Sequence, residues 1–147
     1  MNLSEPALMT IGRVAKLANV GIDTVRFYER RGLLPEARRS AAGYRQYAPG
    51  TVDRLQFIRR AKTLGFSLEE IGTLLDLQDT GGSKSAVKAI TARKLAQIDA
   101  KLQDLTRMRS VLHTLHQDCS GSGSICGCPI IDALAHADDL PLTGDTP

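Results

Sequence analysis

The sequence predicts a mainly helical protein in which several short helices precede one long helix. Apolar residues recur every three or four positions through much of residues 10–77, and this is the period of an amphipathic helix. Residues 85–117 then contain neither proline nor glycine, a run long enough for a helix of about 50 Å. A chain of 147 residues suits one small domain with an extended element, which argues against a large enzyme core.

The first two predicted helices flank a tight turn. Thr10 can cap a helix over residues 11–18, whose apolar positions have helical spacing. The break follows at residues 19–21, where Gly21 is expected to adopt a positive φ. The next helix ends at Gly32. This is a helix-turn-helix pattern, in which the second helix enters the major groove of DNA.

A short hairpin, or wing, is predicted next. The stretch "PEARRSAAGYRQYAPG" alternates basic and aromatic residues between proline and glycine. Such a hairpin can place these side chains along a phosphate backbone. The residues concerned are Arg38, Arg39, Tyr44, Arg45 and Tyr47.

Two further helices complete the predicted head. The first begins after Pro49 and is terminated by Gly65. Ser67 and Glu70 form a capping box for the second, which is expected to end at about Leu77. We assign residues 9–78 to a winged helix-turn-helix domain and the glycine-containing residues 79–84 to a linker.

The long helix, expected over residues 85–117, carries an apolar stripe without a core to cover it. The stripe consists of Leu95, Ile98, Leu102, Leu105 and Leu112, with Met108 and Leu115 beside it. Packing onto the small head would cover only part of its length. The sequence therefore favours a partner helix from a second chain, and hence a homodimer.

Charge divides the chain into two unlike parts. Residues 1–62 hold 12 Lys and Arg against 5 Asp and Glu, whereas the remainder holds 7 against 11. The basic part suggests a nucleic-acid partner, although a solvated basic face is the simpler alternative. No segment approaches the ~20 apolar residues of a membrane span, and the N-terminus has no signal pattern, so a cytoplasmic protein without a membrane partner is expected.

All three cysteines lie in the stretch "DCSGSGSICGCPII". In a reducing compartment such a cluster indicates metal or redox chemistry rather than disulfides. Cys119 and Cys128 can turn their sulfurs toward one ion, and Cys126 can add a third. Thiolates favour Cu(I), Ag(I), Au(I), Hg(II), Zn(II), Cd(II) or Pb(II). Two alternatives are redox-sensing thiols and a structural zinc, which needs a fourth ligand such as His113, His116 or His136.

The C-terminal part is divided on composition. Residues 118–136 are assigned to a metal-binding loop and the short helix expected in "PIIDALAHA". Residues 137–147 are acidic and contain proline, which predicts a disordered tail. No other convergent set of His, Asp and Glu is visible, so an enzyme is not expected.

Taken in order, these segments resemble the MerR family of metal-responsive transcription regulators. The likeness covers nearly the whole chain and rests on "TVRFYERRGLL" in the recognition helix, "GYRQY" in the wing, "LQFIRRAKTLGFSLEEI" across the next two helices, and "CPII" after the cysteines. It implies a winged helix-turn-helix head, a long helix that pairs antiparallel with its twin as a coiled coil, and a metal loop near the partner subunit.

The resemblance also implies a mechanism and a set of contacts. Family dimers occupy a promoter whose −35 and −10 elements are too far apart for RNA polymerase, and the metal-bound form activates transcription by bending and untwisting the DNA. By motif position, the DNA contacts would be Thr24, Arg26 and Tyr28 on the recognition helix, and Arg39, Tyr44, Arg45 and Tyr47 in the wing.

This chain departs from the family pattern at the start of the long helix. Members that answer divalent ions have a cysteine there, and members that answer copper, silver or gold have a serine. Here the stretch "GGSKSAVK" puts Lys84 at that position, with Ser83 and Ser85 beside it. Two thiolates around a monovalent ion leave one negative charge, which Lys84 and the helix N-terminus could compensate. This slightly favours a monovalent ion held by Cys119 and Cys128.

Loop length points partly the other way. The gap of eight residues between Cys119 and Cys128 resembles the mercury-type loop more than the shorter copper-type loop. Cys126 could then replace the missing helix cysteine and give a three-sulfur site for Hg(II), Pb(II), Cd(II) or Zn(II). This alternative and a thiol-based redox sensor of the same fold remain open.

Overall fold

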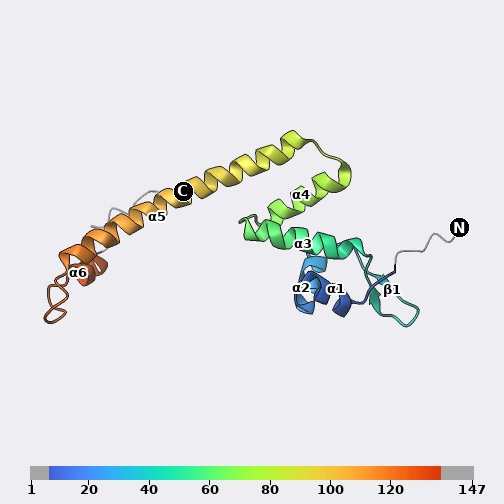
Figure 1. The fold of residues 1–147 in the computed structure, drawn as a ribbon, viewed down its shortest axis with the longest axis horizontal. Coiled ribbons are helices and arrows are strands. Elements are labelled where there is room, and N and C mark those ends of the chain that lie inside the picture. Colours follow the sequence, from blue (N-terminus) through green and yellow to red (C-terminus); the bar gives the residue numbers. More distant parts are fainter. Residues whose placement is uncertain (1–6, 137–147) are drawn as a thin grey trace. The chain divides into compact units, whose positions relative to one another are not determined.

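A computed structural model describes residues 7–136, so the predicted tail at 137–147 lies outside the described residues. The fold is mainly helical with one two-stranded wing, which confirms the predicted fold class. Figure 1 shows the elements, which are α1 (Ile11–Ala18), α2 (Ile22–Arg30), β1 (Arg38–Arg39), β2 (Arg45–Gln46), α3 (Gly50–Thr63), α4 (Leu68–Thr80), α5 (Lys84–Asp118) and α6 (Pro129–Ala135). The chain forms two compact units that divide after Thr91.

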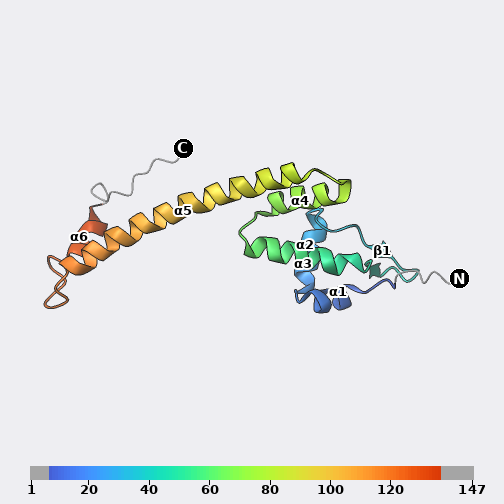
Figure 2. The same cartoon turned by 45° about the horizontal axis from the view of Figure 1, so that its top comes forward.

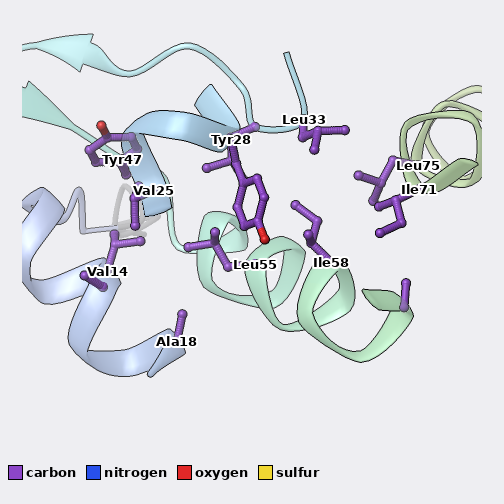
Figure 3. Close-up of a cluster of buried hydrophobic side chains, with 13 residues drawn as sticks. Val14, Ala18, Val25, Tyr28, Leu33, Tyr47, Leu55, Ile58, Ile71 and Leu75 are labelled. Atoms are coloured by element: carbon purple, nitrogen blue, oxygen red, sulfur yellow. The ribbon is translucent and has the colours of Figure 1, made fainter. Parts of the chain in front are cut away.

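The first unit has one hydrophobic core, built by helices α1 to α4. Helix α3 contacts both α1 and α4, and α1 also contacts α2; Figure 2 shows α3 and α4 side by side. Figure 3 shows the buried side chains of this core, among them Val14, Val25, Leu55, Ile58, Ile71 and Leu75. Burial of these apolar groups holds α2 against α1 and α3.

Two predicted helix caps are present. The Thr10 hydroxyl accepts a hydrogen bond from the backbone N–H of Arg13 at 3.2 Å. At the start of α4, the Ser67 hydroxyl accepts from the Glu70 N–H at 3.2 Å, and the Glu70 carboxylate accepts from the Ser67 N–H at 2.7 Å. These bonds satisfy backbone donors that have no partner inside the helix.

Two details of the predicted head are wrong. The left-handed residue of the helix-turn-helix corner is Asn19, with φ 56°, whereas Gly21 has φ −74° and serves as the N-cap of α2. Asparagine tolerates the left-handed region better than most residues, so glycine is not required there. Helix α4 also continues to Thr80, three residues past its expected end, because only Gly81 supplies the left-handed cap with φ 73°.

The wing is the expected antiparallel hairpin. Arg38 pairs with Gln46, and Arg39 pairs with Arg45. Before α1, the backbone of Met9 exchanges two hydrogen bonds of 2.8 Å with Tyr47. The wing is therefore joined to the segment that leads into α1 as well as to α3, which follows it in the chain.

The second unit contains the rest of α5, the cysteine loop and α6. Helix α6 lies beside the last turns of α5 in both views (Figures 1 and 2). The predicted apolar stripe of α5 is exposed at Leu95, Ile98, Leu102, Leu105, Met108 and Leu112. Within residues 7–136, the structure contains no helix with the length and hydropathy that crossing a membrane requires.

Candidate DNA-binding surface and cysteine site

Helix α2 and the wing enclose a basic hollow of about 540 Å³. Three arginine side chains line it, together with an exposed tyrosine of the wing and the first residues of α1. The lining residues are Thr10, Ile11, Arg26, Arg30, Gly43, Tyr44 and Arg45. Guanidinium groups gathered in this way can bind phosphate oxygens through charge-assisted hydrogen bonds. The hollow brings together residues predicted separately from the helix and from the wing.

Several predicted DNA contacts lie at the surface. The side chain of Arg26 is 53% exposed and lies 3.8 Å from the fully exposed Asp23, a pairing that solvent weakens. Arg39 is exposed and donates to the Gly43 carbonyl at 3.0 Å within the wing. Tyr44 is 74% exposed and Thr24 is half-buried. These four residues are available to a duplex.

Tyr28 and Tyr47 depart from the expectation that they touch DNA. Only 8% of Tyr28 and 1% of Tyr47 are exposed, and both rings belong to the core in Figure 3. Burial raises the pKa of both phenols, and for Tyr47 a hydrogen bond to Glu29 raises it further. These two rings therefore pack inside the head and offer little surface to a duplex.

Arg45 is exposed only in part and is engaged by a residue that sequence reasoning missed. Its guanidinium donates to the Glu29 carboxylate at 3.0 Å. Arg30 was missed as well, although it follows Arg26 by four residues and helical spacing puts both on one face of α2. The pairing of Glu29 with Arg45 spans 16 residues and has no local sequence signal.

The cysteine loop connects the end of α5 to the start of α6. The Cys119 N–H continues the helical pattern by donating to the Leu115 carbonyl at 3.2 Å, and Cys128 is the N-cap residue of α6. Between them Gly121, Gly123 and Gly127 all have positive φ. These glycines let the backbone reverse in few residues, as the sequence suggested.

Cys119 and Cys128 are half-buried and line the same hollow of the loop. The backbone N–H groups of Ile131 and Ile130 lower the pKa of the Cys128 thiol, and a hydrogen bond from Cys119 lowers it further. A thiolate is the form that binds soft metal ions. The pair therefore has the chemistry of a metal-binding site.

Cys126 lines the same hollow as Cys119 and Cys128. It is exposed, and within residues 7–136 no three His, Cys, Asp or Glu side chains gather as a group that could hold a metal ion. The predicted three-sulfur site is thus not formed by the chain in this conformation. His113 and His116 line a different hollow, which is mainly apolar. Its other lining residues are Leu105, Met108, Arg109, Leu112 and Ile130.

Lys84 is the first residue of α5 and is exposed. The Ser83 hydroxyl accepts a hydrogen bond from the Ala86 N–H at 3.2 Å. It also shares a hydrogen bond of 2.9 Å with the Ser85 hydroxyl, in which either oxygen can donate. Ser83 thus acts as a cap, and no sulfur is available where the resemblance led us to look for a third ligand. Lys84 belongs to the first unit, whereas the cysteines belong to the second.

Comparisons with known proteins agree with this architecture. Residues 9–78 match the family model for MerR HTH regulatory proteins, and residues 52–115 match the model described as MerR, DNA binding. The chain is 42% identical to the mercuric resistance operon regulatory protein of Bacillus cereus, over 84% of this chain and 95% of that protein.

Two solved structures are similar along most of their length. A transcription regulator from Ralstonia metallidurans in complex with lead(II) is 35% identical, with a TM-score of 0.78, and the match covers 86% of this chain and 98% of that one. A regulator from Bacillus megaterium in complex with mercury(II) is 37% identical, with a TM-score of 0.67 and coverage of 86% and 99%.

Proposed function

Because this chain belongs to the MerR family of transcription regulators, we propose that it binds promoter DNA as a homodimer and activates transcription when a thiophilic metal ion binds its cysteine loop. The recognition helix α2 contributes Thr24 and Arg26 to the DNA surface, and the wing contributes Arg39 and Tyr44. RNA polymerase at the same promoter is the functional partner. In this scheme the ion favours a protein–DNA conformation in which the DNA is bent and untwisted.

The ion is a soft divalent one, of which Hg(II) is the best example. The observation that carries this proposal is that the half-buried Cys119 and Cys128 line one hollow of the loop, where a hydrogen bond from Cys119 helps to lower the pKa of the Cys128 thiol. The similar regulators crystallised with metal hold lead(II) and mercury(II). These relatives give no support to the preference for Cu(I), Ag(I) or Au(I) that the sequence slightly favoured.

Charge balance explains why two sulfurs suit Hg(II). Two thiolates and one divalent ion form a neutral site, whereas two thiolates around a monovalent ion carry one negative charge that is costly to bury. A neutral site needs no counter-charge from Lys84, the residue at the position of the missing cysteine. The chain can therefore bind Hg(II) without a sulfur at the start of α5.

Cys126 is proposed to be dispensable for this binding. It is exposed, whereas Cys119 and Cys128 are half-buried. An ion that requires three sulfurs, such as Pb(II), would need Cys126 to move into the pair. Comparing these ions in a Cys126→Ser variant therefore separates the two coordination modes.

The proposal is tested by metal titration of the reduced full-length protein, with X-ray absorption on each complex. We expect Hg(II) to bind through two sulfurs in the unchanged protein and in Cys126→Ser, and to lose this site in Cys119→Ser and Cys128→Ser. A reporter driven by a promoter recovered by immunoprecipitating the protein with DNA should respond to Hg(II) at lower concentration than to Cu(I).

Other outcomes identify the alternatives. Three sulfurs around the ion, with loss of one in Cys126→Ser, would show that the loop forms a three-thiolate site. A stronger response to Cu(I) would restore the monovalent reading. Activation by an oxidant in metal-free buffer would instead indicate a redox sensor that uses the same cysteines.

A further inference from the structure

One carboxylate links the recognition helix to both strands of the wing. Glu29 on α2 accepts hydrogen bonds from the Tyr47 hydroxyl at 2.7 Å, from the Arg45 guanidinium at 3.0 Å and from the Ala37 N–H at 3.4 Å. Ala37 precedes β1, Arg45 lies in β2, and Tyr47 follows β2. Glu29 thus contacts the wing at its start and at its end.

Among residues 7–136, no other side-chain hydrogen bond joins α2 to the wing. The Glu29 side chain is only 12% exposed, so its bonds to Tyr47 and Ala37 are partly shielded from competing water, whereas its bond to Arg45 lies at the surface. A charged acceptor with several donors in such a setting fixes geometry more firmly than a neutral surface contact.

The position of Glu29 is unexpected for electrostatic reasons. The basic hollow between α2 and the wing is lined by Arg26, Arg30 and Arg45. The Glu29 carboxylate pairs with Arg45 and so reduces the positive charge that this arginine offers to phosphate. A surface selected only for attraction to DNA would do better without it. The carboxylate must therefore contribute something other than charge.

We propose that Glu29 is a positioning residue for DNA recognition, which sets the angle between α2 and the wing so that Arg26 and the wing residues Arg39 and Tyr44 meet one duplex together. In this arrangement Arg45 donates one N–H to Glu29, and only its other N–H groups can contact phosphate. The inference rests on the proposed DNA-binding function and assigns to Glu29 the geometry of that surface.

The signs of the expected effects separate positioning from simple charge. Removing a negative charge near DNA should strengthen binding to any sequence, because phosphate attraction is independent of sequence. Loss of the correct angle should instead weaken binding to the cognate sequence, which requires base contacts and phosphate contacts at once. Glu29→Gln keeps the size of the side chain, removes its charge and replaces one of its two acceptor oxygens with an NH2 donor. Because the three bonds use both carboxylate oxygens, the amide cannot keep all of them.

The experiment uses the full-length, metal-free protein and two DNA probes. One probe is a duplex selected from a random-sequence library by the unchanged protein, and the other is a duplex of the same composition in scrambled order. Glu36→Gln is the matched control, because Glu36 is exposed, neighbours the wing and forms no ion pair with other described residues. Arg26→Gln tests the DNA surface itself, and Tyr47→Phe removes one of the three bonds without changing charge.

For Glu29→Gln we expect cognate affinity to fall about tenfold, as loss of a charge-assisted hydrogen bond network implies, while affinity for the scrambled duplex is unchanged or higher. Tyr47→Phe should shift cognate affinity in the same direction by a smaller factor. Glu36→Gln should leave the ratio of cognate to scrambled affinity unchanged. The salt dependence should steepen in Glu29→Gln by about one phosphate contact, since Arg45 is released.

Two results would overturn the inference. If Glu29→Gln behaves like Glu36→Gln while Arg26→Gln loses cognate affinity, the DNA surface is correct and Glu29 does not position it. If Arg26→Gln binds both probes normally, the proposed DNA surface itself is wrong. Melting temperatures of all variants identify any that unfold. If Glu29→Gln is unfolded, Tyr47→Phe decides: weaker cognate binding supports the inference, and unchanged cognate binding contradicts it.

Discussion

Arg54 on α3 donates to both carboxylate oxygens of Asp79, in the last turns of α4, at 2.9 and 2.8 Å. Its Nε also donates to the backbone carbonyl of Leu33 at 2.7 Å. Leu33 follows the recognition helix and lies close to α4, because a Cβ built on Gly72 would be 3.4 Å from its side chain. One arginine therefore ties the end of the recognition region to α3 and α4.

We expect Arg54→Gln to be more destabilising than Asp79→Asn. The first change leaves the Leu33 carbonyl without its donor in a part-buried setting, which costs about 1–3 kcal/mol. The Asp79 side chain is 52% exposed, so loss of its ion pair should cost less than about 1 kcal/mol. Urea unfolding at fixed protein concentration measures both values. Equal effects would mean that the ion pair, and not the Leu33 bond, carries the stabilisation.

The capping box of α4 provides a local test. Ser67→Ala removes the hydroxyl that accepts from the Glu70 N–H and should lower the free energy of unfolding by about 1 kcal/mol. Ser67→Asp keeps an acceptor at the same place and should lose little. The two variants are compared by urea unfolding. A loss of similar size in both would argue that packing around residue 67, rather than capping, is responsible.

At the corner of the helix-turn-helix, two substitutions of one residue should change the stability of the head in different directions. Asn19 has φ 56°, where a residue with an ordinary side chain is strained by roughly 1 kcal/mol. Asn19→Ala should therefore destabilise the head by about that amount, and Asn19→Gly should be neutral or stabilising. Thermal unfolding distinguishes the three proteins. Destabilisation by glycine as large as by alanine would show that the asparagine side chain itself is needed.

Local features could be predicted from the sequence, whereas pairings between distant residues could not. The Thr10 cap, the capping box and the hairpin depend on residues within a few positions of one another, and each is present. The burial of Tyr28 and Tyr47 depends on helices packing around them, and the tyrosines looked equally suited to DNA from spacing alone. Likewise, nothing near Arg45 in the sequence indicates that Glu29 binds it.

The same holds for the cysteine site. Crowding of three cysteines and the glycines between them predicted a tight loop, and the loop has that form. The sequence slightly favoured Cys119 and Cys128 as the pair, but whether Cys126 joins them could not be predicted, because all three cysteines lie within ten residues. Cys128 is the N-cap residue of α6, whereas Cys126 lies within the turn before it, in which the Cys128 N–H donates to the Ile125 carbonyl at 3.1 Å.

Stability at alkaline pH should depend on the buried tyrosines. Burial, together with the hydrogen bond to Glu29, raises the pKa of Tyr47 above its ordinary value of 10.0. The folded protein therefore holds the proton more tightly than the unfolded chain, so the stabilising contribution is present below about pH 10 and is lost as pH rises further. Stability measured from pH 8 to 11 should fall less steeply in Tyr47→Phe. Tyr44→Phe, a change at an exposed ring, should leave the slope as it is.

The apolar stripe of α5 leads to a prediction about assembly. Leu102, Leu105 and Leu112 are each more than half exposed, and such a stripe is covered when two helices pair. In Leu105→Glu, each chain would bring an unpaired carboxylate into the seam. The cost of several kcal/mol should raise the dimer dissociation constant by about a thousandfold. Analytical ultracentrifugation at micromolar concentration would then find monomers.

Gln103→Glu is the matched control for this change. At about 100° per residue, Gln103 lies on nearly the opposite side of α5 from Leu105, and the substitution introduces the same carboxylate. A dimer in Gln103→Glu and a monomer in Leu105→Glu would locate the seam on the stripe. A dimer in both would mean that α5 does not pair through these leucines, because no helix seam tolerates two buried, unpaired carboxylates at its centre without a large loss of affinity.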